Sequence, residues 1–233
     1  MKKWMVALAA AALMAGGRCA ADGTSAVRRV QMPPRNVRGA ANLQVLGPWD
    51  TAAWVWGPAR DLPPGGEFLR FRRTFEADGV ASLRFHVTAD QRFVLLLDGE
   101  VVARGPDRGA PDLWFVQSYE TFLSKGTHCL EAVCWRMGAQ QAPLAQLTVK
   151  PGFLFKAEGA YDKTLTTGVA PWQVAPLVGT RMGDGKYPMG GVGAQCEVRG
   201  TGLESERPDD AAYGPVRVVR GPIRPNPSGS LRA

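Results

Sequence analysis

Hydrophobic and polar residues alternate along two stretches of the chain, in the pattern typical of β-strands. Residues 67–75 place Leu69, Phe71 and Phe75 on one side and Arg70, Arg72 and Thr74 on the other. Residues 83–88 repeat the alternation, with Leu83, Phe85 and Val87 on the apolar side. Because successive side chains of a strand point to opposite faces, both stretches are predicted to be half-buried antiparallel strands.

Further short apolar runs, separated by turn residues, predict more strands. They lie at residues 93–97, 101–103, 113–119, 127–135 and 144–149, with weaker candidates at 153–155 and 166–174. Residues 67–150 show no helical periodicity, and roughly seven short strands over such a length are typical of two packed sheets. We therefore predict an all-β fold, an antiparallel two-sheet β-sandwich that is jelly-roll-like.

Two pairs of turn residues separate these strands. Asp98-Gly99 stands between two apolar runs, which is a strong signal for a two-residue β-hairpin. Gly105-Pro106 then ends the second strand of that hairpin. We assign structural turn roles to Asp98, Gly99, Gly105 and Pro106.

The N-terminus has the composition of a secretory signal peptide. Lys2 and Lys3 precede an apolar run at residues 4–15, and Cys19-Ala20-Ala21 fits a cleavage site with small residues. Residues 1–21 are therefore predicted to be the signal peptide of a secreted or periplasmic protein, with a buried N-terminal helix as the alternative. The run is too short for a transmembrane span, and Arg18 argues against lipid anchoring at Cys19.

The rest of the chain divides by composition. We expect an irregular segment at residues 22–48 and the β-sandwich domain at residues 49–178. A glycine- and proline-rich segment follows at residues 179–233, and its end is expected to be poorly ordered.

The amount and distribution of positive charge bear on whether the protein binds nucleic acid. The formal charge of +7 falls to about +4 when Lys2, Lys3 and Arg18 leave with the signal peptide. Many of the remaining arginines lie near the two ends, among prolines and glycines, as in solvated tails. No nucleic-acid-binding motif accompanies them, so we expect no nucleic-acid partner.

Cysteine and histidine content limits metal and disulfide chemistry. Cys129, Cys134 and Cys196 follow the signal peptide, and an odd number cannot pair completely within one chain. Cys129 and Cys134 lie on one predicted strand with their side chains on opposite faces, too far apart to bond each other. The two histidines, His86 and His128, fall on the polar side of their strands, where we expect them at the surface. We expect no cofactor and no metal site.

An ordered set of short motifs runs through the predicted strands. Thr88-Ala89-Asp90 precedes an apolar strand, the Asp98-Gly99 turn and Gly105-Pro106. This order resembles the N-terminal β-sandwich of bacterial α-L-rhamnosidase-like glycoside hydrolases. Further segments agree in the same order, namely Trp54-Val55-Trp56, Phe71-Arg72-Arg73-Thr74-Phe75, residues 123–130, Trp135-Arg136-Met137-Gly138 and Pro171-Trp172-Gln173-Val174. The resemblance covers about residues 49–178.

The resemblance implies carbohydrate chemistry and leaves catalysis open. In such enzymes a helical α/α-barrel farther along the chain carries the hydrolytic carboxylates, and this sequence contains no such barrel. Residues 208–213 resemble the opening of a second module, with Tyr213 where a tryptophan is usual. Hydrolysis of a glycosidic bond needs two carboxyl groups across the bond. Among the candidate carboxylates, Asp90, Asp98, Asp107 and Asp112 are assigned to turns and loops, and no catalytic pair is identified.

Sugar binding requires less than hydrolysis. An aromatic ring stacks on the apolar face of the sugar, and polar side chains bind its hydroxyls. The candidate carbohydrate-binding residues are Asp90, Arg104, Asp107, Asp112, Trp114, Trp54 and Trp56. We place the site in the loop from Asp90 and Arg104 to Trp114, at one end of the sandwich. Core packing is the alternative for most of the tryptophans.

The sequence thus predicts a secreted, non-catalytic accessory or carbohydrate-binding β-sandwich of the α-L-rhamnosidase type. The expected partners are a plant or microbial polysaccharide or glycoside, with rhamnose as the sugar that the resemblance implies, and other domains of a glycosidase. Two alternatives stay open. One is the N-terminal fragment of an active α-L-rhamnosidase that hydrolyses terminal rhamnosides, and the other is a protein-docking module.

Overall fold

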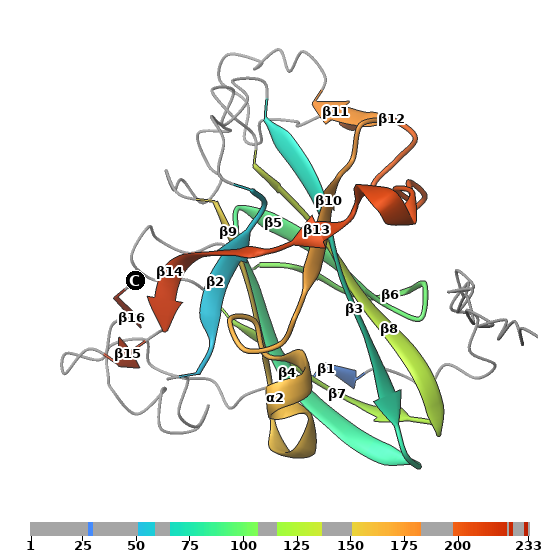
Figure 1. Cartoon of the computed structure of the whole chain (residues 1–233), viewed down its shortest axis with the longest axis vertical. Helices are drawn as coiled ribbons and strands as arrows, with labels where there is room; N and C mark the ends of the chain where they lie inside the picture. Colours follow the sequence, from blue (N-terminus) through green and yellow to red (C-terminus); the bar gives the residue numbers. More distant parts are fainter. Residues whose placement is uncertain are drawn as a thin grey trace, which may run out of the picture.

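A computed structural model shows two antiparallel β-sheets packed face to face (Figure 1). The structure describes residues 28–29, 51–58, 66–106, 116–136, 151–182, 198–222, 224–225 and 231–232. Each main sheet has six strands. This architecture confirms the predicted all-β sandwich.

The first sheet has the strand order β1-β7-β4-β9-β2-β14. Its strands are β1 (Arg28–Arg29), β7 (Gln117–Leu123), β4 (Ala81–Asp90), β9 (Gly152–Ala157), β2 (Ala53–Trp56) and β14 (Arg217–Pro222). Strand β4 lies inside this sheet, paired with β7 on one side and β9 on the other.

The second sheet has the strand order β13-β10-β3-β8-β5-β6. Its strands are β13 (Gly214–Pro215), β10 (Gln173–Pro176), β3 (Glu67–Ala77), β8 (Gly126–Arg136), β5 (Arg92–Leu97) and β6 (Glu100–Gly105). Strands β3 and β8 pair along their whole lengths, from Glu67 opposite Arg136 to Ala77 opposite Gly126.

Short elements complete the described part of the chain. Two small sheets pair β11 (Thr180–Met182) with β12 (Val198–Gly200) and β15 (Arg224–Pro225) with β16 (Leu231–Arg232). One α-helical turn, α2 (Asp162–Leu165), and two 3-10 turns, η1 (Gly159–Tyr161) and η2 (Asp210–Ala212), are the helical segments described.

The core lies between the two sheets and contains the residues that the alternation predicted. Phe71 and Phe75 of β3 share one buried cluster with Phe85 and Val87 of β4. Phe71 of the second sheet contacts Phe153 of the first, with ring centroids 5.0 Å apart. Burial of such aromatic side chains removes a large apolar area from water and holds the sheets together.

The β5–β6 hairpin lies where the sequence predicted it. Asp98 and Gly99 have positive φ values of 52° and 87°, as a type I′ turn requires at both central positions. Close packing explains the glycine at the end of β6, because a Cβ added at Gly105 would lie 2.8 Å from Cε1 of Phe93.

The weaker strand candidate at residues 166–174 is mostly wrong. The backbone N–H of Thr166 bonds the carbonyl of Asp162 and ends α2, and a turn follows before β10 begins at Gln173. Gly168 adopts a φ of 86° in that turn, and a Cβ there would lie 3.1 Å from the backbone nitrogen of Ala53. The candidate at 144–149 and the predicted signal peptide lie outside the described residues.

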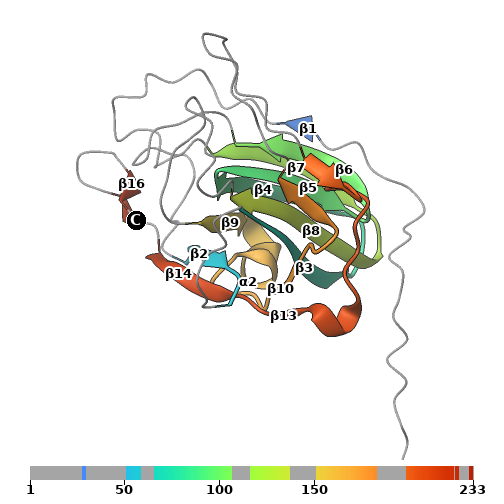
Figure 2. The ribbon, with the colours of Figure 1, turned by 90° about the horizontal axis from the view of Figure 1, so that it is seen from above.

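Segments beyond the expected domain boundaries add strands to the sandwich. Strand β13 pairs with β10, and strand β14 pairs with β2, so residues 214–222 extend both sheets. Figure 2 shows this C-terminal ribbon, in red, running along one side of the sandwich. At the other edge of the first sheet, Arg28–Arg29 pairs with β7. Edge strands have unpaired backbone groups, which these additions satisfy.

The two described cysteines both lie on strand β8. Cys129 and Cys134 are both buried on β8 and are not bonded to each other, as their positions on one strand predicted. Burial raises the pKa of the Cys134 thiol well above its ordinary value. Cys196 lies outside the described residues.

Candidate functional site

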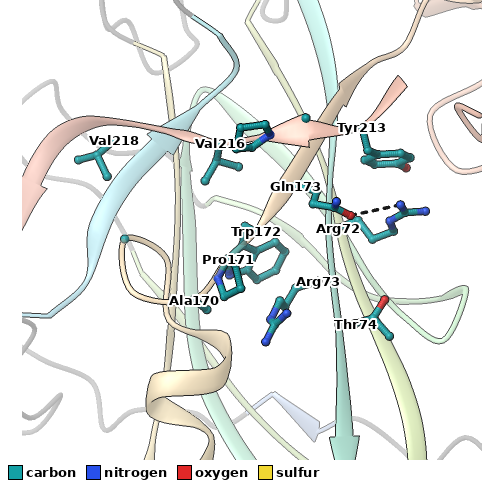
Figure 3. A pocket seen from close by; sticks show the side chains of 13 residues that line it. Arg72, Arg73, Thr74, Ala170, Pro171, Trp172, Gln173, Tyr213, Val216 and Val218 are labelled. Carbon is teal, nitrogen blue, oxygen red and sulfur yellow. Dashed lines mark hydrogen bonds between the residues drawn. The ribbon is translucent and has the colours of Figure 1, made fainter. Parts of the chain in front are cut away.

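A hollow of about 630 Å³ opens at the side of the sandwich along which the C-terminal strands run (Figure 3). Its lining residues come from Arg72–Thr74 of β3, from the turn at residues 168–173 and from residues 213–218. Three segments that are far apart in sequence therefore form one cavity.

The pairing of β3 explains why the hollow lies here. Strand β10 pairs with β3 only from Leu69 to Arg72, where Gln173 is the last partner. Beyond Arg72, β3 continues to Ala77 with β8 as its only partner strand among the described residues. On the side of β10, no described strand pairs with β3 at Arg73 and Thr74, and both residues line the hollow.

Arg72 is held by three neighbours at the rim. Its Nη1 donates a hydrogen bond to Oδ1 of Asp210 at 2.5 Å, and its Nη2 donates to Oε1 of Gln173 at 3.3 Å. The guanidinium carbon also lies 3.8 Å from the centroid of the Tyr213 ring, a cation–π contact. Burial lowers the pKa of Arg72, but the Asp210 hydrogen bond and nearby negative charge outweigh it and raise the pKa.

Tyr213 contributes a neutral phenol to the hollow. Burial, with the negative charge of Glu131, raises the pKa of Tyr213 to about 12. The hydroxyl therefore keeps its proton at neutral pH and can act as both donor and acceptor.

Arg73 is the second cation of the hollow. Its Nε donates to the backbone carbonyl of Thr164 at 2.9 Å. Burial lowers the pKa of Arg73, and no charged neighbour offsets this effect. Among the described residues no carboxylate pairs with this guanidinium.

Apolar groups form the remaining wall. Pro171, Pro215 and Val216 line the hollow, and Val218 is 50% exposed. The Trp172 ring also borders the hollow but is 1% exposed, and its Nε1 donates to the carbonyl of Leu165 at 2.7 Å. The hollow thus combines two guanidinium groups, a phenol and an amide with an apolar surface, and none of its lining residues is a carboxylate. Two carboxyl groups, as glycoside hydrolysis requires, are not among its lining residues.

The structure corrects the expectation that Trp54 and Trp56 bind carbohydrate. Both indole rings are 1% exposed, so a ligand at the surface cannot stack on them. Nε1 of Trp56 donates to Oε2 of Glu67 at 3.0 Å, which satisfies its polar group inside the protein. Strand β2 is fully buried because β9 and β14 flank it.

The other predicted binding residues are not brought together by the described structure. Asp90 ends β4 with no exposed surface, and Arg104 on β6 forms an ion pair with Glu204. Asp107, Asp112 and Trp114 lie outside the described residues. The proposed loop site at that end of the sandwich therefore stays a prediction.

Both histidines are buried, contrary to the expected surface positions. His86 is 2% exposed, with Nδ1 2.8 Å from Oγ of Ser118 and Nε2 2.7 Å from Oε1 of Glu158. His128 is 4% exposed and contacts Asp98. The outward-facing side of a strand is not always solvated, and these polar groups are buried because hydrogen-bond partners meet them.

Sequence reasoning did not identify the residues of the hollow as a site. Arg72, Arg73 and Gln173 entered only as parts of motifs, and Tyr213 only as a departure from one. One signal was available, because Arg73 occupies the apolar phase between Phe71 and Phe75. A cation in that phase marks a place where the strand face is not covered by core.

Two further points about the described residues concern transmembrane helices and metal sites. None of their helices has the length and apolarity to cross a membrane. The described residues also contain no cluster of three or more His, Cys, Asp or Glu side chains suited to a metal ion.

Comparisons with known proteins bear on the fold. No protein-family model and no curated protein matches the chain. A solved GH78 family rhamnosidase of Bacillus sp. GL1 is similar with a TM-score of 0.56 and 24% identity, over 76% of this chain and 19% of that one. A lectin of Pleurotus ostreatus matches with a TM-score of 0.43 and 14% identity, over 78% of this chain and 45% of that one. An α-L-rhamnosidase of Streptomyces avermitilis matches with a TM-score of 0.39 and 14% identity, over 75% and 15% of the two chains.

Of these three structures, the Bacillus rhamnosidase, with a TM-score of 0.56, supports a shared fold. This chain spans about a fifth of the length of that rhamnosidase, since it covers 19% of it. The resemblance to α-L-rhamnosidase-like glycoside hydrolases is therefore confirmed as a shared β-sandwich fold.

Proposed function

We propose that this chain is a secreted or periplasmic, non-catalytic accessory β-sandwich of the α-L-rhamnosidase type, and that it binds carbohydrate. The observation that carries the proposal is the fold shared with part of a GH78 rhamnosidase, at a TM-score of 0.56 over 76% of this chain. The hollow beside β3 and Tyr213 is the binding site that we propose.

The chemistry of the hollow suits a sugar. The Tyr213 phenol, the Gln173 amide and the Thr74 hydroxyl offer donors and acceptors to sugar hydroxyls. Pro171, Pro215 and Val216 offer an apolar surface to the C–H groups of a pyranose ring. Concave sites that combine an apolar lining with a few convergent polar groups are the usual form of small-ligand sites.

Calorimetric titration of the purified chain with rhamnose-containing oligosaccharides tests this function. We expect saturable binding that Tyr213→Ala weakens about tenfold, the equivalent of ~1.4 kcal/mol. The matched control is Phe122→Ala, which truncates an aromatic residue that is 57% exposed on β7 of the first sheet. Equal weakening by both variants, or no binding by the wild-type chain, would contradict the proposal.

A second candidate is the front part of an active α-L-rhamnosidase. This chain covers 19% of the Bacillus rhamnosidase, a length that fits one domain of such an enzyme. The mass of the native secreted product separates the two readings. A product that starts near Asp22 and ends at Ala233 supports a free-standing sandwich. A product several times larger would indicate that this chain is the N-terminal part of a glycosidase, where it accompanies a catalytic barrel.

A further inference from the structure

Strand β3 carries three arginines, Arg70, Arg72 and Arg73, and their partners differ. Arg70 forms a two-pronged ion pair with Glu131, at 2.7 Å and 2.8 Å. Arg72 bonds Asp210 at 2.5 Å. Arg73 alone of these three has no carboxylate partner among the described residues, and its one hydrogen bond goes to the carbonyl of Thr164.

This leaves most of the Arg73 guanidinium uncommitted. An arginine has five N–H donors, and the two terminal nitrogens of Arg73 form no hydrogen bond with the described residues. Burial lowers its pKa, and no charged group among the described residues offsets this effect. A partly exposed guanidinium that has no carboxylate partner among the described residues is open to an anionic ligand.

The position of Arg73 directs this charge into the hollow. Its side chain lies in the phase of Phe71 and Phe75, toward the sandwich interior, at the point where β10 no longer covers β3. Figure 3 shows it below Trp172 and Pro171 at the opening. No acidic side chain lines the hollow, and Arg72 is paired with Asp210, so Arg73 is the lining charge that has no carboxylate partner among the described residues.

We propose that the hollow takes an acidic saccharide, with the carboxylate of a uronic acid residue on the terminal nitrogens of Arg73. This inference rests on the proposed carbohydrate-binding function and adds the substrate class. The planar guanidinium fork matches a carboxylate through two parallel hydrogen bonds, which a lysine cannot reproduce. Thr74, Gln173 and Tyr213 then meet the hydroxyls of the same or the next sugar.

The test compares two ligands that differ in the charge of their carboxyl groups and by one methyl group at each. An oligogalacturonate and the same oligosaccharide with its carboxyls methyl-esterified are titrated into the full chain. We expect the free acid to bind at least tenfold more tightly than the ester. Raising the salt to about 0.5 M should weaken binding of the acid and leave the ester unchanged, because salt screens exposed charges. Equal affinities for acid and ester would overturn the inference.

Variants then assign the preference to Arg73. Arg73→Gln should lower affinity for the free acid at least tenfold and leave affinity for the ester within twofold, and Arg73→Lys should recover only part of the loss. The control is Arg181→Gln, which removes the same charge from an exposed position on β11. Loss of affinity in the control to the same extent would overturn the role of Arg73.

The outcomes separate this inference from the proposed function. Binding of the neutral ester and the rhamnose-containing oligosaccharides without preference for the acid refutes the inference alone. Absence of binding to all of these sugars refutes both. A sulfated oligosaccharide that binds as tightly as the uronate would show a general anion site and refute the carboxylate pairing. If Arg73→Gln loses its fold by circular dichroism, the comparison of acid and ester on the wild-type chain still decides.

Discussion

Asp98 at the β5–β6 turn bonds His128 on the neighbouring strand β8. The carboxylate accepts a hydrogen bond from Nδ1 of His128 at 2.7 Å and another from the backbone N–H of Cys129 at 2.8 Å. Nε2 of His128 lies 3.0 Å from the carbonyl of Ser124. Both ring nitrogens face oxygen acceptors, an environment that favours the doubly protonated imidazolium.

We predict that Asp98→Asn lowers the pKa of His128. Burial alone lowers this pKa, but the hydrogen bonds to Ser124 and Asp98 and the charge of Asp98 raise it above its ordinary value. The variant removes that charge and keeps a residue that tolerates positive φ. Proton NMR titration can follow both histidines, since the chain has 2. An unchanged His128 pKa would contradict the contact, and His86 serves as the internal control.

The sign of the linked stability follows from this shift. A histidine with a raised pKa in the folded state stabilises the protein fully below its unfolded pKa of about 6.5. That contribution is lost as the pH rises through the folded-state pKa. In Asp98→Asn this contribution should be smaller and its loss should be complete at a lower pH, which urea unfolding at a series of pH values measures.

His86 should give the opposite pH dependence. Burial lowers its pKa, against the hydrogen bond and charge of Glu158, and the positive charges of Arg84 and Lys156 lower it further. Protonation then favours the unfolded chain, so this contribution to stability is present above about pH 6.5 and lost as the pH falls toward the folded-state pKa. His86→Gln should flatten the slope of unfolding free energy against pH below 6.5. A slope equal to that of the wild type would show that His86 does not titrate in this way.

The buried pair of Arg70 and Glu131 is predicted to be the most sensitive charge pair described. Arg70 has no exposed surface, Glu131 is 6% exposed, and Nη1 of Arg70 also donates to the carbonyl of Glu206 at 3.1 Å. Arg70→Met leaves a buried carboxylate without its partner and should cost about 3–5 kcal/mol of unfolding free energy.

Two matched variants control this prediction. Arg70→Met combined with Glu131→Leu should recover much of the loss, because it removes the orphaned charge. Arg84→Met, which breaks an exposed pair with Glu120, should cost no more than about 1 kcal/mol. A similar loss at Arg70 and Arg84 in chemical denaturation would show that burial does not set the cost.

The hairpin turn supplies a prediction about backbone conformation. Gly99 has a φ of 87° with no atom near the position of an added Cβ, so Gly99→Val acts through the backbone and not through a clash. Left-handed conformation costs an ordinary residue roughly 1–2 kcal/mol, and valine is among the least tolerant residues. The control is Gly79→Val in the β3–β4 turn, which also has open space but no positive φ. Equal melting temperatures for the two variants would count against the turn geometry.

Local sequence patterns predicted the elements whose signals come from neighbouring residues. The alternation in residues 67–75 and 83–88 matches β3 and β4, and Asp98-Gly99 matches the β5–β6 turn. Such signals depend only on the period of the strand and on the φ that a turn requires. The prediction of a strand at residues 166–174 was mostly wrong because the turn at residues 166–172 depends on a tertiary contact with Ala53 and on a helical hydrogen bond to Asp162.

What the sequence by itself determined is the all-β class, the phase of the core residues and the hairpin, because each follows from a few adjacent positions. The tertiary structure was needed to show which polar faces are covered, as His86 and His128 show, and where the hollow lies. The contact of Arg72 with Asp210 joins residues 138 positions apart in the sequence. Strand β14 pairs with β2, which also lies far from it in the sequence. No local pattern specifies such pairs, because they form only when strand order and register bring edges together.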